Sequence, residues 1–129
     1  RRLLRSYRRG AGKMTGSGVQ RSDFAAIAGW IRPDARVLDL GCGMGHWRTA
    51  LEKLAPKARH RGVEYSDYLC ERFGWEKGSA VDFAPGRTFD LVVCQGVLQY
   101  LDDRAAARAI DNLADLEKEA NPVLYYKTR

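Results

Sequence analysis

Cysteine is scarce in this chain of 129 residues, which contains only Cys42, Cys70 and Cys94. Three cysteines without C-x-x-C spacing argue against a disulfide scaffold and against a zinc site built from cysteines. No apolar run approaches the roughly 20 residues that a membrane-spanning helix needs, and the basic first residues lack the apolar segment of a secretory signal. We therefore expect one water-soluble domain without a metal ion or a membrane contact, in a reducing, cytoplasmic setting.

Acidic residues are missing from the first 22 positions, which carry seven arginines and lysines. The other 15 basic and 16 acidic residues nearly cancel, so the net charge of +6 is concentrated at this end. A glycine-rich loop is predicted at residues 10–18. We interpret residues 1–22 as a basic N-terminal arm and residues 23–129 as the domain. Such an arm is either a solvated leader or a contact for nucleic acid and other acidic surfaces.

Strand and helix patterns alternate along the domain. The sequence predicts strands over residues 36–40, 60–64, 75–81, 89–94 and 123–126, and helical spacing predicts helices over 23–31, 47–54 and 69–73. Ser66 and Asp102 are predicted helix caps. After Asp102 a long helix should turn these residues inward: Ala105, Ala106, Ala109, Ile110, Leu113 and Leu116. The alternation predicts an α/β fold with a doubly wound, mostly parallel sheet of about five strands.

The most informative segment is a glycine turn between a predicted strand and a predicted helix. It reads D-x-G-x-G-x-G, with Asp39 followed by Gly41, Gly43 and Gly45. A dinucleotide-binding turn needs G-x-G-x-x-G, and position 46 is histidine, so a nicotinamide-dependent dehydrogenase is a poor match. Glycine-rich turns also occur for packing alone. The pattern resembles the first motif of the class I, Rossmann-like methyltransferases that use S-adenosylmethionine.

This resemblance implies a binding role for each residue of the turn. Gly41, Cys42, Gly43 and Gly45 would line the methionine and ribose parts of the cofactor. Asp39 would orient the turn or bond the cofactor's amino group.

The resemblance continues after the turn, over roughly residues 30–127. Glu64 would accept hydrogen bonds from the ribose hydroxyls, and Tyr65 would flank the adenine. Asp82 would accept a hydrogen bond from the adenine amino group, and Phe83 would cover the ring. The alternatives are a surface acid at a helix start for Glu64 and a turn aspartate for Asp82.

The predicted strand 89–94 leads to the reacting end of the site. By resemblance, Gln95 would lie under the methionine half of the cofactor. Tyr100 stands where many relatives carry histidine, or else it packs on a helix face. His46, Gln95 and Tyr100 are nearest the reacting end, and none is assigned as a catalytic base.

The resemblance implies methyl transfer from S-adenosylmethionine, with a small molecule as the expected acceptor. RNA or protein acceptors and a non-catalytic binding or scaffold domain remain alternatives. Members of this family commonly have two more strands after the fifth, so we expect a piece of a longer chain. Nothing in the sequence is predicted to pair beyond strand 123–126. Such an exposed edge would favour homo-oligomers.

Overall fold

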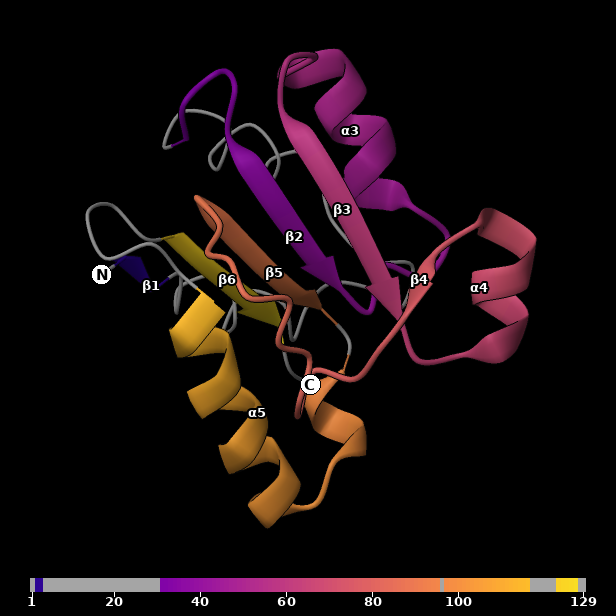
Figure 1. Cartoon of the computed structure of the whole chain (residues 1–129), viewed down its shortest axis with the longest axis vertical. Helices are drawn as coiled ribbons and strands as arrows, with labels where there is room; N and C mark the ends of the chain where they lie inside the picture. The colour runs from indigo at the N-terminus through magenta and orange to yellow at the C-terminus, as the bar shows by residue number, and fades with distance from the viewer. Residues whose placement is uncertain (1, 4–30, 96, 117–122, 128–129) are drawn as a thin grey trace.

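The core of the fold is a parallel sheet with helices on both of its faces (Figure 1). The computed structural model describes residues 2–3, 31–95, 97–116 and 123–127. The sheet has six strands in the order β1-β6-β5-β2-β3-β4, and every neighbouring pair is parallel. The strands are β1 (Arg2–Leu3), β2 (Arg36–Leu40), β3 (Arg59–Glu64), β4 (Glu76–Lys77), β5 (Leu91–Gln95) and β6 (Val123–Lys127). This arrangement confirms the predicted α/β fold class.

Helices connect these strands. They are α3 (His46–Leu54), α4 (Asp67–Phe73), the 3-10 helix η2 (Leu98–Tyr100) and α5 (Asp103–Leu116). Of these, α4 and α5 begin at the caps that the sequence predicts. The Ser66 hydroxyl accepts a hydrogen bond from the Leu69 amide at 3.3 Å. The Asp102 carboxylate accepts one from the Ala105 amide at 2.8 Å. Both contacts satisfy amide groups that a helix start leaves without a partner.

Successive residues of β2 and β5 point to opposite faces of the sheet, and this alternation creates two cores. On one face, α3 contributes Trp47 and Leu51 to a cluster with Ala35, Val37, Ala55, Leu91 and Val93. On the other face, α5 contributes Ala109, Leu113 and Leu116 to a cluster with Leu38, Leu40, Val63, Ala80, Phe89, Val92, Cys94 and Leu98. The central strands are therefore buried on both sides, which explains the apolar run Leu91–Cys94 of β5.

Two details of the predicted elements are wrong. The strand predicted over 75–81 spans only Glu76–Lys77, because the chain then turns and the amides of Val81, Asp82 and Phe83 all donate to Ser79. Ile110 was predicted to face inward, but 42% of its surface is exposed. The buried stripe of α5 runs through Ala109, Leu113 and Leu116, and Ile110 lies one residue, or about 100°, away from it.

The far edge of the sheet also differs from the prediction. We predicted no partner beyond residues 123–126, yet β1 pairs there in parallel, with Arg2 opposite Val123 and Leu3 opposite Leu124. The remaining positions of the arm and most of the helix predicted over 23–31 lie outside the described residues. Among the helices that are described, none is long and apolar enough to cross a membrane.

Candidate functional site

The glycine turn connects β2 to α3 at the carboxyl edge of the sheet. Gly41, Gly43 and Gly45 have φ angles of 79°, 53° and 81°, a left-handed conformation that side chains disfavour. The amides of Gly41 and Cys42 both donate to the Val63 carbonyl, at 2.7 and 3.3 Å. The turn is therefore held against the end of β3, the neighbouring strand.

Glu64, the last residue of β3, holds the middle of this turn. Its Oε1 accepts a hydrogen bond from the Gly43 amide at 3.0 Å, and its Oε2 accepts one from the Ser66 amide at 2.8 Å. The carboxylate thus joins the glycine turn to the start of α4. A carboxylate has about four acceptor positions, so these two bonds leave capacity for a ligand. The sequence placed Glu64 at the site, but it did not reveal these two backbone partners.

Gly43 has a second contact, from a residue that the sequence analysis did not single out. The Trp75 indole Nε1 donates a hydrogen bond to the Gly43 carbonyl at 2.7 Å. A Cβ added to Gly43 would meet no atom within 4 Å, so this glycine borders open space. A Cβ on Gly45 would lie 3.1 Å from Trp75. Gly43 therefore faces outward, whereas Gly45 faces the protein.

Asp39 lies beneath the turn and is almost completely buried. Its Oδ2 is 2.9 Å from His60 Nε2, on the adjacent strand β3. Burial raises the pKa of the Asp39 carboxyl, and the bond and charge of His60 oppose that rise. The structure thus brings Asp39 to a side chain of β3. The predicted contact of Asp39 with a cofactor amino group stays a prediction.

Two of the cysteines are buried near the turn. Burial raises the pKa of Cys94 to about 12 and also lifts the pKa of the Cys42 thiol well above its usual range. Both thiols are therefore protonated at neutral pH and are poor nucleophiles. Gln95 ends β5, at the carboxyl edge where the sequence analysis expected it. The Gln95 side chain lies outside the part of the chain that the structure describes.

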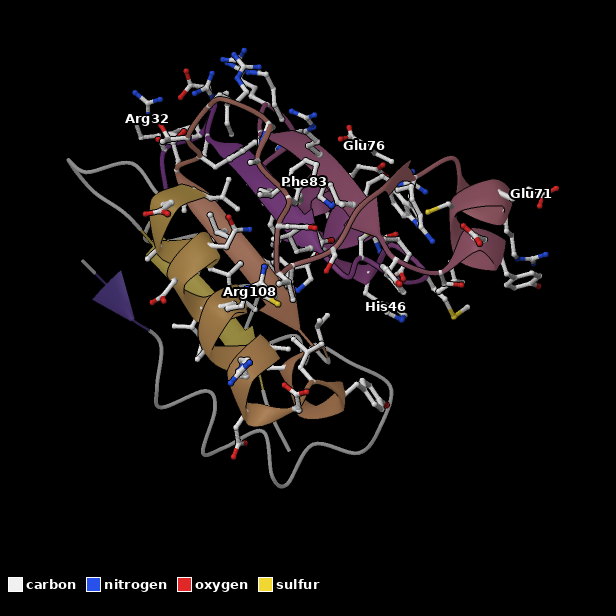
Figure 2. All side chains as sticks on the ribbon, turned by 60° about the horizontal axis from the view of Figure 1, so that its bottom comes forward. Arg32, His46, Glu71, Glu76, Phe83 and Arg108 are labelled. Carbon is white, nitrogen blue, oxygen red and sulfur yellow. The ribbon has the colours of Figure 1, made fainter. Side chains whose placement is uncertain are left out.

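Tyr65 directly follows β3, and Asp82 and Phe83 lie in the segment that follows β4. The Tyr65 side chain is 69% exposed, and the Lys77 ammonium lies 4.4 Å from the centre of its ring. Asp82 is exposed, whereas Phe83 is half-buried and packs on the α5 side of the core. Figure 2 labels Phe83 over the sheet, and His46 projects from the carboxyl edge. Tyr65 and Asp82 are thus accessible to a ligand, and Phe83 already has protein neighbours.

Asn112, on α5, is a further residue that the sequence analysis missed. Its Nδ2 donates to the carbonyls of Ala80 and Phe83, both at 3.0 Å. The segment that carries Asp82 is therefore fixed to the helix. The sequence could have indicated Asn112, because it is an amide side chain beside Ala109 and Leu113 on the inward side of the helix.

Comparisons with known proteins bear on the family and the fold of the chain. A family model described as a methyltransferase domain matches residues 15–125. No curated protein matches the chain.

Solved structures of similar fold have low sequence identity to the chain. An amino pentose methyltransferase from Micromonospora echinaspora, bound to S-adenosylmethionine, has a TM-score of 0.63 at 24% identity, over 84% of this chain and 50% of that chain. A glycopeptide N-methyltransferase in complex with sinefungin has a TM-score of 0.65 at 19% identity, over 78% and 49%. An S-adenosylmethionine-dependent methyltransferase from Clostridium acetobutylicum has a TM-score of 0.61 at 20% identity, over 91% and 54%.

The chain spans about half the length of each of these three proteins. These proteins share the fold of this chain, and the methyltransferase family model covers most of the sequence. This chain therefore belongs to the methyltransferase domain family.

Proposed function

We propose that this domain binds S-adenosylmethionine at the glycine turn and that the protein is an enzyme that transfers the methyl group to a small molecule. The observation that carries the proposal is the outward-facing Gly43, whose amide is bonded to the carboxylate at the end of β3. This arrangement leaves main chain and a carboxylate side by side at the carboxyl edge of the sheet. Ligands of open α/β sheets bind at that edge.

The residues around the turn fit the cofactor. The open space at Gly43 admits a ligand directly against the backbone, and Glu64 keeps acceptor capacity for two ribose hydroxyls. Tyr65 is exposed and offers a ring to an adenine, and the exposed Asp82 offers an acceptor for its amino group. Gly41 and Gly45 shape the turn through their left-handed backbone.

The chemistry divides between the cofactor and the chain. When bound, S-adenosylmethionine would supply an electrophilic methyl group, which would pass to the acceptor as the methyl–sulfur bond breaks and S-adenosylhomocysteine leaves. The chain's part is to hold the ligand and the acceptor close together and aligned. A general base is needed only when the acceptor atom carries a proton with a high pKa. The site residues are therefore assigned to binding and orientation.

A small-molecule acceptor is supported by two of the structural neighbours, which are named as an amino pentose methyltransferase and a glycopeptide N-methyltransferase. Those names describe those proteins, and we extend the class of acceptor to this chain as part of the proposal. The cytoplasm is the proposed location, since the chain is poor in cysteine and its three cysteines are unpaired.

Calorimetry with S-adenosylhomocysteine and, separately, with NAD tests the choice of cofactor. We expect heat of binding from S-adenosylhomocysteine and none from NAD. Binding of NAD alone would overturn the proposal. Binding of S-adenosylhomocysteine without methyl transfer to any small amine or hydroxyl acceptor would favour a binding or scaffold role.

A matched pair of glycine variants locates the site. Gly43→Val places a side chain in the open space that the cofactor would occupy, in a backbone conformation with φ of 53°. Gly86→Val adds the same side chain in open space with φ of 76°, far along the sequence in the 84–88 loop. Both variants strain the backbone similarly, so only Gly43→Val should abolish binding. Equal affinities would place the cofactor elsewhere.

A further inference from the structure

We propose that Trp75 is a positioning residue for the cofactor site, because its indole fixes the conformation of Gly43. The proposal rests on the proposed function, and it concerns a residue outside the glycine turn. Gly43 is held at both ends: its amide donates to Glu64 at 3.0 Å, and its carbonyl accepts from Trp75 at 2.7 Å. These two bonds come from different parts of the chain and converge on Gly43, which borders open space.

The end of α4 directs Trp75 toward the turn. Gly74 follows the helix with φ of 74°, and the amides of Gly74 and Trp75 both donate to the Cys70 carbonyl, at 2.8 and 3.1 Å. This glycine cap reverses the chain direction at the helix end. The indole therefore enters the space between α4 and the start of α3 instead of continuing outward.

The indole is packed closely in that space. A Cβ on Gly62 would lie 2.5 Å from Trp75 Cε3, so only glycine at this position of β3 leaves room for the ring. The Arg48 guanidinium of α3 lies 4.4 Å from the ring centre, a cation–π distance. The His60 ring is 5.9 Å away. Contacts from α3 and β3 thus fix the direction in which the indole N–H points.

This fixed donor has a consequence for ligand binding. A glycine with a left-handed backbone samples many other conformations when it is unrestrained. Each conformation that the turn must abandon on binding reduces affinity. Trp75 restrains Gly43 before a ligand arrives, and this keeps the Gly43 amide directed at Glu64. The cofactor then meets a turn that is already in its binding conformation.

Trp75→Phe removes the N–H while keeping an aromatic ring. We expect S-adenosylhomocysteine affinity to fall about three- to tenfold, which is the range for one neutral hydrogen bond. The matched control is Trp47→Phe, since Trp47 is buried in the α3 core. That variant should lower the melting temperature. It removes no hydrogen bond from Gly43, so the affinity should stay within about twofold of wild type. An unchanged affinity in folded Trp75→Phe would overturn the proposal.

A spectroscopic measurement separates positioning from general stability. In the ¹H–¹⁵N spectrum without ligand, Trp75→Phe should move the Gly43 amide signal while the signals of α5 stay in place. In wild type, the Trp75 indole proton should exchange slowly with solvent. A Gly43 signal that does not move, or a rapidly exchanging indole, would contradict the assignment. This readout remains valid even if wild type binds no S-adenosylhomocysteine, a result that would refute the proposed function alone.

Gly62→Ala tests the same idea without removing the indole. Its Cβ would overlap the ring, so the indole must shift and its bond to Gly43 must weaken. We expect the same direction of change in affinity and in the Gly43 signal. If Trp75→Phe does not fold, Gly62→Ala and the wild-type exchange rate still decide the question.

Discussion

Replacing Glu64 with alanine is the strongest test of the site, because it removes both acceptors that join the glycine turn to α4. The Gly43 and Ser66 amides would lose partners at 3.0 and 2.8 Å. Hydrogen bonds to charged groups contribute about 1.5–3 kcal/mol each. Glu64 is half-exposed, so water can replace part of what is lost. We therefore expect the free energy of unfolding to fall by about 1–3 kcal/mol in total.

The same substitution should also weaken ligand binding. The ribose hydroxyls lose their charged acceptor, which corresponds to an affinity about ten- to a hundredfold lower for S-adenosylhomocysteine. Urea unfolding measures the stability change, and calorimetry measures the affinity. Glu71→Ala is the control, because Glu71 is an exposed acid on α4 that points away from the turn in Figure 2. It should leave both quantities near wild type.

Glu64→Gln refines the interpretation. Its amide oxygen can accept from one of the two backbone amides, while its NH₂ group faces the other donor. We expect an intermediate loss of stability. If Glu64→Ala unfolds like wild type and binds S-adenosylhomocysteine with wild-type affinity, Glu64 neither holds the turn nor contacts the ligand, and the description of the site is wrong.

Three further predictions follow from contacts within the fold. The raised pKa of Asp39 means that its contribution to stability is fully present below the ordinary aspartate pKa of 3.8 and is lost as pH rises from there through the folded-state pKa. Asp39→Asn should lessen this decline in urea unfolding measured against pH, and parallel curves for the two proteins would refute it. Asn112→Ala should free the Ala80 and Phe83 carbonyls and cost about 1–3 kcal/mol, with faster amide exchange in residues 80–83 as the measurement. Leu113→Ala leaves a cavity in the fully buried α5 core and should cost about 2–5 kcal/mol in thermal unfolding, whereas Ile110→Ala, at an exposed position, should cost less.

Local sequence was enough to determine much of the fold and part of the site. The strands β2, β3 and β5, the caps Ser66 and Asp102, and the left-handed glycines all follow from the residue types within a few positions. The alternation of strands and helices then requires parallel pairing, because a right-handed crossover returns each strand to the same direction. This is why the carboxyl edge could be identified as the site before the side-chain geometry was known.

Contacts between distant residues depended on the tertiary structure. The Gly43 bonds to Glu64 and Trp75 span 21 and 32 positions, and Asn112 reaches back 32 positions to Ala80. Contacts between residues so far apart in the sequence leave no periodic pattern that could predict them, because the partners meet only after the strand order is set. The pairing of β1 with β6 joins the two ends of the described chain for the same reason. Sequence thus determined which residue types stand at the edge of the sheet, and packing between α3, β3 and α4 decided which of them hold the glycine turn.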